Sequence, residues 1–105
     1  MIVALGGDDL IFGRGGDDVI CAGDGNDVVF GQDGEDWIDA GAGVDAVFGQ
    51  DDDDELFGGP GNDALFGGDG DDLLDGGPQS DVCAGGDGDN TFVACEIILR
   101  GGGHH

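Results

Sequence analysis

The sequence predicts an all-β fold: a right-handed parallel β-solenoid of ten nine-residue repeats, with two short strands in each coil. Three observations predict it. A nine-residue period runs unbroken through residues 4–93, an apolar residue recurs at the eighth position of every repeat, and glycine, aspartate and asparagine dominate the first six positions. The chain has 105 residues, a length that fits a single domain.

The repeats keep one frame along the chain. They begin at Ala4, Gly13, Ala22, Gly31, Ala40, Gly49, Gly58, Gly67, Gly76 and Gly85. Position eight is held by Ile11, Ile20, Val29, Ile38, Val47, Leu56, Leu65, Leu74, Cys83 and Phe92. Successive side chains of a strand face opposite sides, so position eight should face inward and positions seven and nine outward. Two strands per coil then place repeats i and i+2 about 4.8 Å apart.

The first six positions of each repeat have the composition of a turn. Position four is glycine in eight repeats, and Asp52 and Gln79 are the exceptions. This position should need a positive φ, so both exceptions predict distorted turns, and aspartate tolerates that backbone better than glutamine. Position two is Leu5, Arg14, Gln32 or Gln50 in early repeats, which predicts less regular turns there.

The charge balance excludes several partners. Lys and Arg total 2 against 25 Asp and Glu, a formal net charge of -23. Too few cations are present to neutralise nucleic-acid phosphates or an anionic membrane. The composition alone would also fit an acidic disordered tail, but such a tail has no reason to keep an apolar residue in phase. We therefore expect disorder only in the metal-free state.

The aspartates of position six are the candidate metal ligands, together with carbonyl oxygens of the turns. They are Asp9, Asp18, Asp27, Asp36, Asp45, Asp54, Asp63, Asp72 and Asp81, with Asn90 in the last repeat. Ca²⁺ accepts six to eight oxygen ligands in flexible geometry, whereas Mg²⁺ demands a tight octahedron and Zn²⁺ prefers Cys or His. Five turns on each edge leave four gaps, which predicts up to about eight Ca²⁺ ions.

Calcium should be required for folding. The predicted core is one side chain deep, while a glycine-rich chain loses much conformational entropy on folding. The coil also stacks carboxylates above one another, and these repel unless a cation lies between them. The position-five acids, such as Asp8 and Asp17, are interpreted as solvated turn residues.

Two repeats carry a resemblance to a known family. Residues 58–66 and 67–75 fit the pattern G-G-x-G-x-D-x-U-x, with U a large apolar residue, at every defined position. The sequence therefore resembles the RTX (repeats-in-toxin) family. The resemblance implies a parallel β-roll that binds Ca²⁺ between turns on each edge. It also implies a secreted bacterial protein that folds on meeting extracellular calcium.

The predicted domain covers residues 1–100: the repeats at 4–93 and a C-terminal cap at 94–100. Residues 101–105 are interpreted as a linker and the remnant of an affinity tag. Residues 1–3 fit positions seven to nine of a preceding repeat, so the chain is expected to be part of a larger protein. No signal peptide or membrane span is expected. Cys83 and Cys95 could form a disulfide or remain buried thiols, and Cys21 should face outward as a free thiol.

One outer face is predicted to be apolar. Phe12, Phe30, Phe48 and Phe66 recur every eighteen residues at position nine, so they should align in one column. This column is a candidate interface for a homodimer or a neighbouring domain. Alternatively, the rings stack on one another and only stabilise the sheet.

The sequence favours a calcium-binding module that supports the folding or export of a larger secreted protein. The alternative is a structural or adhesive spacer, or a self-association module; an ice-binding face is disfavoured because Thr91 is the only outward threonine. Catalysis is not expected, because Ser80 is the only serine and no histidine lies within the repeats.

Overall fold

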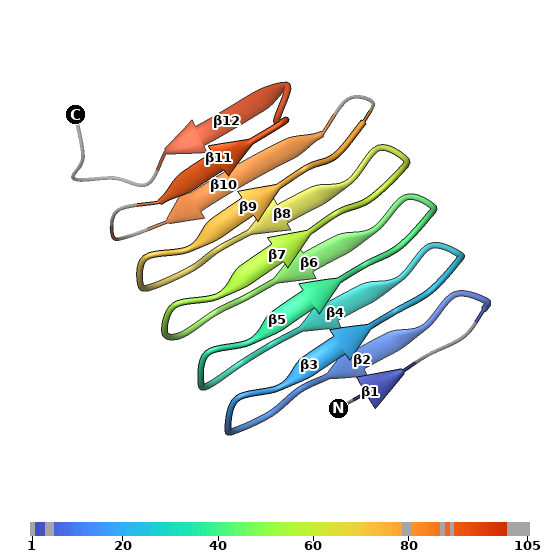
Figure 1. Ribbon diagram of the computed structural model, residues 1–105, viewed down its shortest axis with the longest axis horizontal. Coiled ribbons are helices and arrows are strands. Elements are labelled where there is room, and N and C mark those ends of the chain that lie inside the picture. The colour runs from blue at the N-terminus through green and yellow to red at the C-terminus, as the bar shows by residue number, and fades with distance from the viewer. Residues whose placement is uncertain (1, 4–5, 79–80, 87, 89, 101–105) are drawn as a thin grey trace.

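The computed structural model describes residues 2–3, 6–78, 81–86, 88 and 90–100, and all regular structure in them is β (Figure 1). The strands are β1 Ile2–Val3, β2 Leu10–Phe12, β3 Val19–Cys21, β4 Val28–Phe30, β5 Trp37–Asp39, β6 Ala46–Phe48, β7 Glu55–Phe57, β8 Ala64–Phe66, β9 Leu73–Asp75, β10 Val82–Gly86, β11 Thr91–Val93 and β12 Ile97–Arg100. From β2 to β9 each strand fills positions seven to nine of its repeat, as the period predicts. Among the described residues, none forms a helix of the length and apolarity that a membrane span requires.

Alternate strands pair into two parallel sheets. One sheet has the order β1-β3-β5-β7-β9-β11 and the other β12-β10-β8-β6-β4-β2. Val29, for example, pairs with Ile11 and Val47, so paired residues lie eighteen positions apart. The chain thus winds as a flat coil measuring 39 × 31 × 15 Å, with two strands in each turn of the coil. The predicted parallel β-roll is confirmed.

The core lies between the two sheets and is one residue deep. Position eight is buried from Ile11 to Cys83, with exposed fractions of 0–7%, while Phe92 packs against the end of this column. Ile2 pairs with Ile20 and packs against the other end. The alternation of strand side chains therefore places one hydrocarbon column on the inward face of each sheet, as predicted.

The turns hold two positions with positive φ. Position four has φ values such as 98° at Gly34 and 71° at Asp52. The predicted backbone requirement at Asp52 is thus confirmed, whereas Gln79 lies outside the described residues. Position two has the same conformation even where it is not glycine, with φ of 73° at Arg14 and 69° at Gln32. The left-handed region is disfavoured for these side chains, so the early turns carry local backbone strain.

The C-terminal end departs from the regular coil. β12 pairs with β10, and Ile97 lies opposite Val82, an offset of fifteen residues in place of eighteen. A disulfide joins Cys83 in the core column to Cys95 just before β12, which settles the two alternatives left by the sequence. Cys21 is free and half-buried, as expected.

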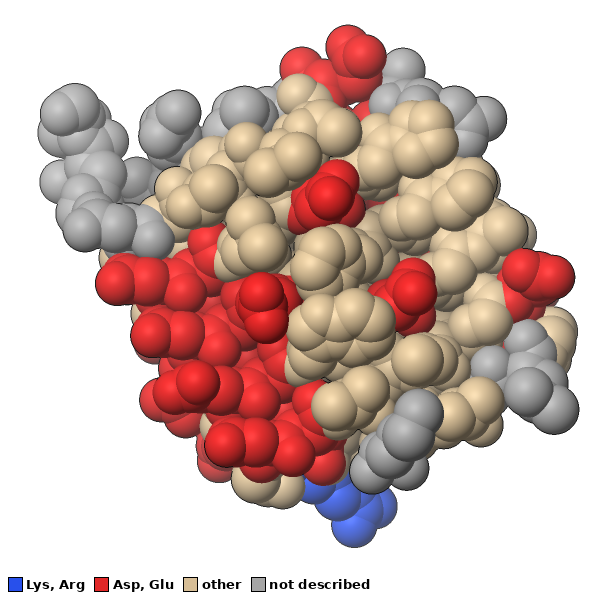
Figure 2. Space-filling view, viewed as in Figure 1, with Lys and Arg blue, Asp and Glu red and all other residues tan. Residues whose placement is uncertain are grey.

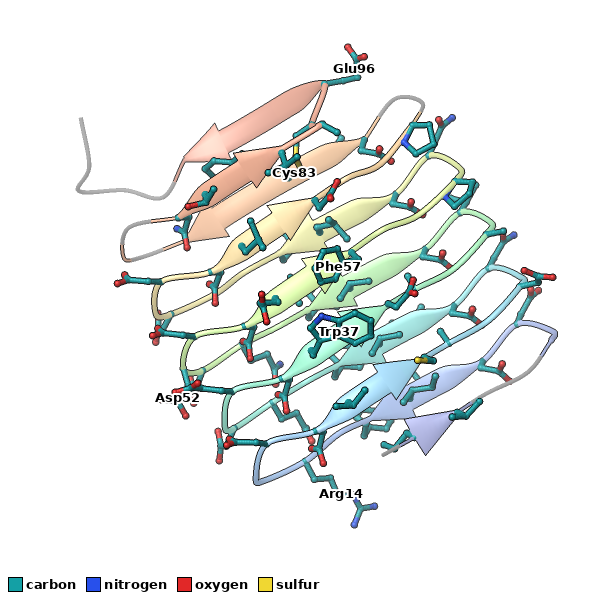
Figure 3. The ribbon with its side chains drawn as sticks, viewed as in Figure 1. Arg14, Trp37, Asp52, Phe57, Cys83 and Glu96 are labelled. Atoms are coloured by element: carbon teal, nitrogen blue, oxygen red, sulfur yellow. A yellow bond between two sulfur atoms is a disulfide. The ribbon has the colours of Figure 1, made fainter. Side chains whose placement is uncertain are left out.

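The two outer faces differ. On the β2–β4–β6–β8 sheet, Phe12, Phe30, Phe48 and Phe66 form one stacked column with ring centroids 4.8–5.1 Å apart and planes within 9° of parallel. On the other sheet, Trp37 and Phe57 make a tilted pair with ring centroids 5.2 Å apart. Figure 3 shows the two side chains on this face. The phenylalanine rings therefore stack on one another, as the hypothesis that they stabilise the sheet predicts.

Candidate calcium-binding edges

The turns line up along the two long edges of the coil (Figure 1). Turns of odd-numbered repeats form one edge, here named the odd edge, and turns of even-numbered repeats form the other, named the even edge. From β2 to β9, each turn of six residues leads from one sheet to the other, and the next turn on the same edge begins eighteen residues later. Identical turn positions are therefore stacked in columns, with eighteen residues between neighbours in a column.

The position-six carboxylates connect neighbouring coils through one of their two oxygens. The backbone amide of Asp27 donates to Oδ1 of Asp45 at 2.8 Å, and the amide of Asp36 donates to Oδ1 of Asp54 at 2.8 Å. The same bond recurs from Asp9 to Asp27 and from Asp63 to Asp81. Each acceptor carboxylate from Asp27 to Asp81 thus reaches back one coil, and the hydrogen bond fixes its orientation.

The second oxygen of these carboxylates has no partner. Seven of the aspartates, from Asp27 to Asp81, are only 0–3% exposed. In all nine aspartates of position six, Oδ2 is buried and accepts no hydrogen bond. A buried carboxylate oxygen without a partner is strongly unfavourable, because the charge is removed from water without compensation. Nine repetitions of this arrangement make both edges candidate cation sites.

The orphaned Oδ2 atoms point into the turn, toward position one of the same repeat. A Cβ built on Gly31 would lie 2.7 Å from Oδ2 of Asp36 and 3.1 Å from the carbonyl oxygen of Gly49. A Cβ on Gly58 would likewise lie 2.7 Å from Oδ2 of Asp63. Glycine at position one therefore keeps free the space beside the carboxylate and beside a carbonyl of the next coil.

Backbone carbonyl oxygens of the turns also point between coils. A Cβ on Gly59 would approach the carbonyl oxygen of Gly41 to 2.7 Å, and one on Gly61 would collide with the carbonyl oxygen of Gly43. Carboxylate and carbonyl oxygens are hard donors, the set that Ca²⁺ prefers. In the described part of the chain, no three His, Cys, Asp or Glu side chains converge as a metal-binding group, so carbonyls must complete any site. The donors present fit a calcium ion.

Burial raises the pKa of the seven position-six carboxyl groups from Asp27 to Asp81 in the absence of a cation. Burial raises the pKa of Asp54 to about 8; the amide of Asp36 opposes this shift, and the carboxylates of Asp72 and Asp36 add to it. The same causes, burial first, raise the pKa of Asp63 and Asp72 to about 7. The metal-free coil therefore holds carboxyl groups that resist ionisation at neutral pH.

Asn90 differs from the other position-six residues. Its Oδ1 accepts the amide of Asp72 at 2.8 Å, so its only side-chain oxygen makes the same coil-to-coil bond. Its Nδ2 takes the place of the orphaned Oδ2, since a Cβ on Gly85 would lie 2.5 Å from it. The last even-edge turn thus offers an amide where the others offer a spare carboxylate oxygen.

Position five also connects coils, which sequence reasoning missed. The amide of Asn26 donates to Oδ1 of Asp8 at 2.9 Å, and that of Glu35 donates to Oδ1 of Asp17 at 2.9 Å. These side chains reach forward to the next coil, opposite to position six. They are exposed, as expected, but they cap the neighbouring coil's backbone. The eighteen-residue period could have indicated these contacts, because it places equivalent turn side chains, as well as strands, one coil apart.

Comparison with known protein families returned one match. The family model described as the RTX calcium-binding nonapeptide repeat matches four times, at residues 1–29, 22–56, 30–65 and 57–92. The chain belongs to this family. The RTX repeat is a structural calcium-binding module, and the family is not one of enzymes. Searches of curated proteins and of solved structures returned no match.

Proposed function

We propose that this RTX chain folds when it binds Ca²⁺ and serves as a folding, export or structural module of a larger secreted bacterial protein. The observation that carries the proposal is the stack of buried, unpartnered Oδ2 atoms on both edges. RTX repeats are typical of secreted bacterial proteins, and extracellular calcium would supply the missing cation. The proposal assigns no catalytic role to the chain itself.

The proposed ligands are the position-six side chains with carbonyl oxygens of the same and the adjacent turns. They are Asp9, Asp18, Asp27, Asp36, Asp45, Asp54, Asp63, Asp72, Asp81 and Asn90. An ion between two coils would offset the charge of the orphaned oxygens and tie both coils together, so its binding free energy would become folding free energy. About eight ions would offset most of the formal charge. The Asn90 site should be the weakest.

A calcium titration followed by far-UV circular dichroism tests this proposal. We expect a disordered spectrum in EGTA and a β-sheet spectrum in millimolar Ca²⁺. Mg²⁺ at the same concentration should be a poor substitute, because it keeps its waters and requires an octahedral site. A β-sheet spectrum that EGTA leaves unchanged would refute calcium-driven folding.

A second function is favoured by the phenylalanine column. Leu10 and Phe12 are 63% and 45% exposed, and the rings of Phe30 and Phe48 continue the same apolar face toward Phe66. We propose that two copies of the chain associate through this face, since a flat strip of this kind can pair with itself about a two-fold axis.

Sedimentation velocity in Ca²⁺ tests self-association. The wild type should form a dimer, and Phe30→Ser/Phe48→Ser should stay monomeric while keeping its calcium-induced circular dichroism. A wild type that remains monomeric at high concentration removes the homodimer, and the face is then left to a neighbouring domain of the larger protein.

A further inference from the structure

The two edges carry the same position-six column but very different surroundings. At position three the even edge has Asp33, Asp51 and Asp69. The odd edge has Asp24 once and otherwise neutral residues at this position. Figure 2 shows the result as a continuous acidic band along the edge where Figure 1 places the turns between β2 and β3, β4 and β5, and β6 and β7.

Position five repeats the contrast. A groove of ≈ 470 Å³ follows the even edge, and Asp17, Glu35, Asp53 and Asp71 line it beside the position-six carboxylates. The corresponding groove of the odd edge, ≈ 380 Å³, is lined at the same position by Asn26, Val44 and Asn62. The buried, unpartnered Oδ2 atoms that call for a cation occur on both edges, so only their surroundings differ.

Position one adds a steric difference. On the even edge it is glycine, and a Cβ on Gly49 would lie only 2.6 Å from Oδ2 of Asp54. On the odd edge Gly58 and Gly76 also stand at this position, but the third and fifth repeats have Ala22 and Ala40 there, both completely buried. Their methyl groups therefore fill, beside Asp27 and Asp45, the space that glycine leaves free on the even edge.

We propose that the two edges are two classes of calcium site, and that the even edge loads at lower free calcium than the odd edge. The inference rests on the proposed function and deepens it, because it divides one calcium response into two stages. Carboxylates close to a cation raise its affinity through local charge, and a methyl group beside a ligand oxygen restricts access. Both effects favour the even edge.

The chain provides a reporter for one edge. Trp37 is its only tryptophan, the chain has no tyrosine, and Trp37 lines the even-edge groove directly after Asp36. Terbium, a trivalent probe for oxygen-ligand calcium sites, luminesces when a nearby tryptophan is excited. Ala46 follows Asp45 at the matching place of the odd-edge groove. The variant Trp37→Phe/Ala46→Trp therefore moves the reporter to the odd edge.

The experiment compares the terbium midpoints of these two proteins, each confirmed by competition with Ca²⁺. We expect the even-edge reporter to reach its midpoint at a terbium concentration about three- to tenfold lower, because several exposed carboxylates surround each even-edge site. The difference between the two terbium midpoints should become smaller when KCl is raised from about 0.05 M to about 0.5 M, since exposed charges are screened. Coincident midpoints at low salt would overturn the proposal.

A charge variant assigns the cause. Asp33→Asn/Asp51→Asn/Asp69→Asn removes outer carboxylates and leaves every position-six aspartate in place. It should raise the terbium midpoint of the even-edge reporter and leave the terbium midpoint of the odd-edge reporter unchanged within error. Asp24→Asn is the matched control on the odd edge. Equal shifts at both reporters would refute the division into classes. Failure of the proposed function would look different: neither reporter would show calcium-competed luminescence, and the circular dichroism would not respond to Ca²⁺.

Discussion

The position-eight column and the position-six column are built by the same repeat and are buried to the same degree, yet they have opposite consequences. Val47 is 0% exposed and Asp45 2%. Stacking hydrocarbon side chains removes apolar surface from water and stabilises the coil. Stacking carboxylates removes charge from water and leaves one oxygen of each without a partner. The hydrocarbon column therefore stabilises the coil by itself, whereas the carboxylate column would need a cation, and under the proposed function we expect calcium binding in the turns to decide when the chain folds.

The largest effect should come from a central aspartate. Asp45→Ala removes a carboxylate that faces a coil on either side, and the amide of Asp27 loses its acceptor. In millimolar Ca²⁺ we expect the free energy of unfolding to fall by about 3–5 kcal/mol, as for the loss of one partner in a buried charged contact. Urea unfolding measures this loss.

Asp9→Ala is the matched control for that substitution. Asp9 belongs to the first described turn and accepts no amide from an earlier coil, while its own amide donates to Asp27. Its loss should shift the calcium midpoint less than Asp45→Ala does. Equal shifts in the two calcium titrations would contradict the assignment of ions to the gaps between coils.

Truncation of the hydrocarbon column should have the next largest effect. Leu65 is completely buried, and Leu65→Ala should lower the free energy of unfolding by about 2–5 kcal/mol. The effect should persist when KCl is raised at saturating Ca²⁺, because it does not depend on charge. A loss that disappears at high salt would show that the two columns are not independent.

Reduction of the disulfide tests the end of the hydrocarbon column. Cys83 and Cys95 are twelve residues apart in sequence, and opening so short a loop should lower the free energy of unfolding by about 2–3 kcal/mol. We expect the loss to be confined to the last coils. Hydrogen exchange with and without reductant should show amides of β10 losing protection while those of β4 and β5 keep theirs, and Cys21→Ser controls for the free thiol.

Protonation of the buried carboxylates should partly replace calcium in stabilising the fold, and this is the smallest of the expected effects. The pKa values of Asp54, Asp63 and Asp72 in the folded, metal-free coil are about 7–8, above the ordinary value of 3.8. Protonation therefore favours folding: its contribution is complete below about pH 3.8 and is lost as the pH rises through about 7–8. In EGTA, the β-sheet signal in far-UV circular dichroism should be stronger at pH 5 than at pH 8. Identical spectra would mean that carboxylate repulsion does not limit the metal-free fold.

The nine-residue period was sufficient to predict most of the fold. It located the strands from β2 to β9, the eighteen-residue register and the inward column from Ile11 to Cys83, because a strict repeat leaves only one stacking that buries position eight. It could not predict the offset of fifteen residues between β10 and β12, since the chain beyond residue 93 does not follow the repeat.

The candidate sites were predicted by residue but not by geometry. The sequence indicated the position-six column, but not that one oxygen of Asp45 would bond to the preceding coil and the other remain without a partner. Nor did it reveal that Arg14 and Gln32 keep the positive φ of the position-two glycines, because such side chains disfavour that conformation. Which carboxylate oxygen bonds to which coil depends on backbone direction, and residue spacing alone does not contain it.

The constant spacing of contacts also determines how the coil responds to a pulling force. From β2 to β9 every strand pairs with a neighbour eighteen residues away, and the side-chain bonds of the turns span the same interval. A force applied to the two ends therefore acts on the contacts of one coil at a time, because the pairings in this stretch join only neighbouring coils. Extension should proceed as unwinding in equal steps, each releasing roughly 60 Å of chain, and relaxation should rewind the coil onto whichever turns remain.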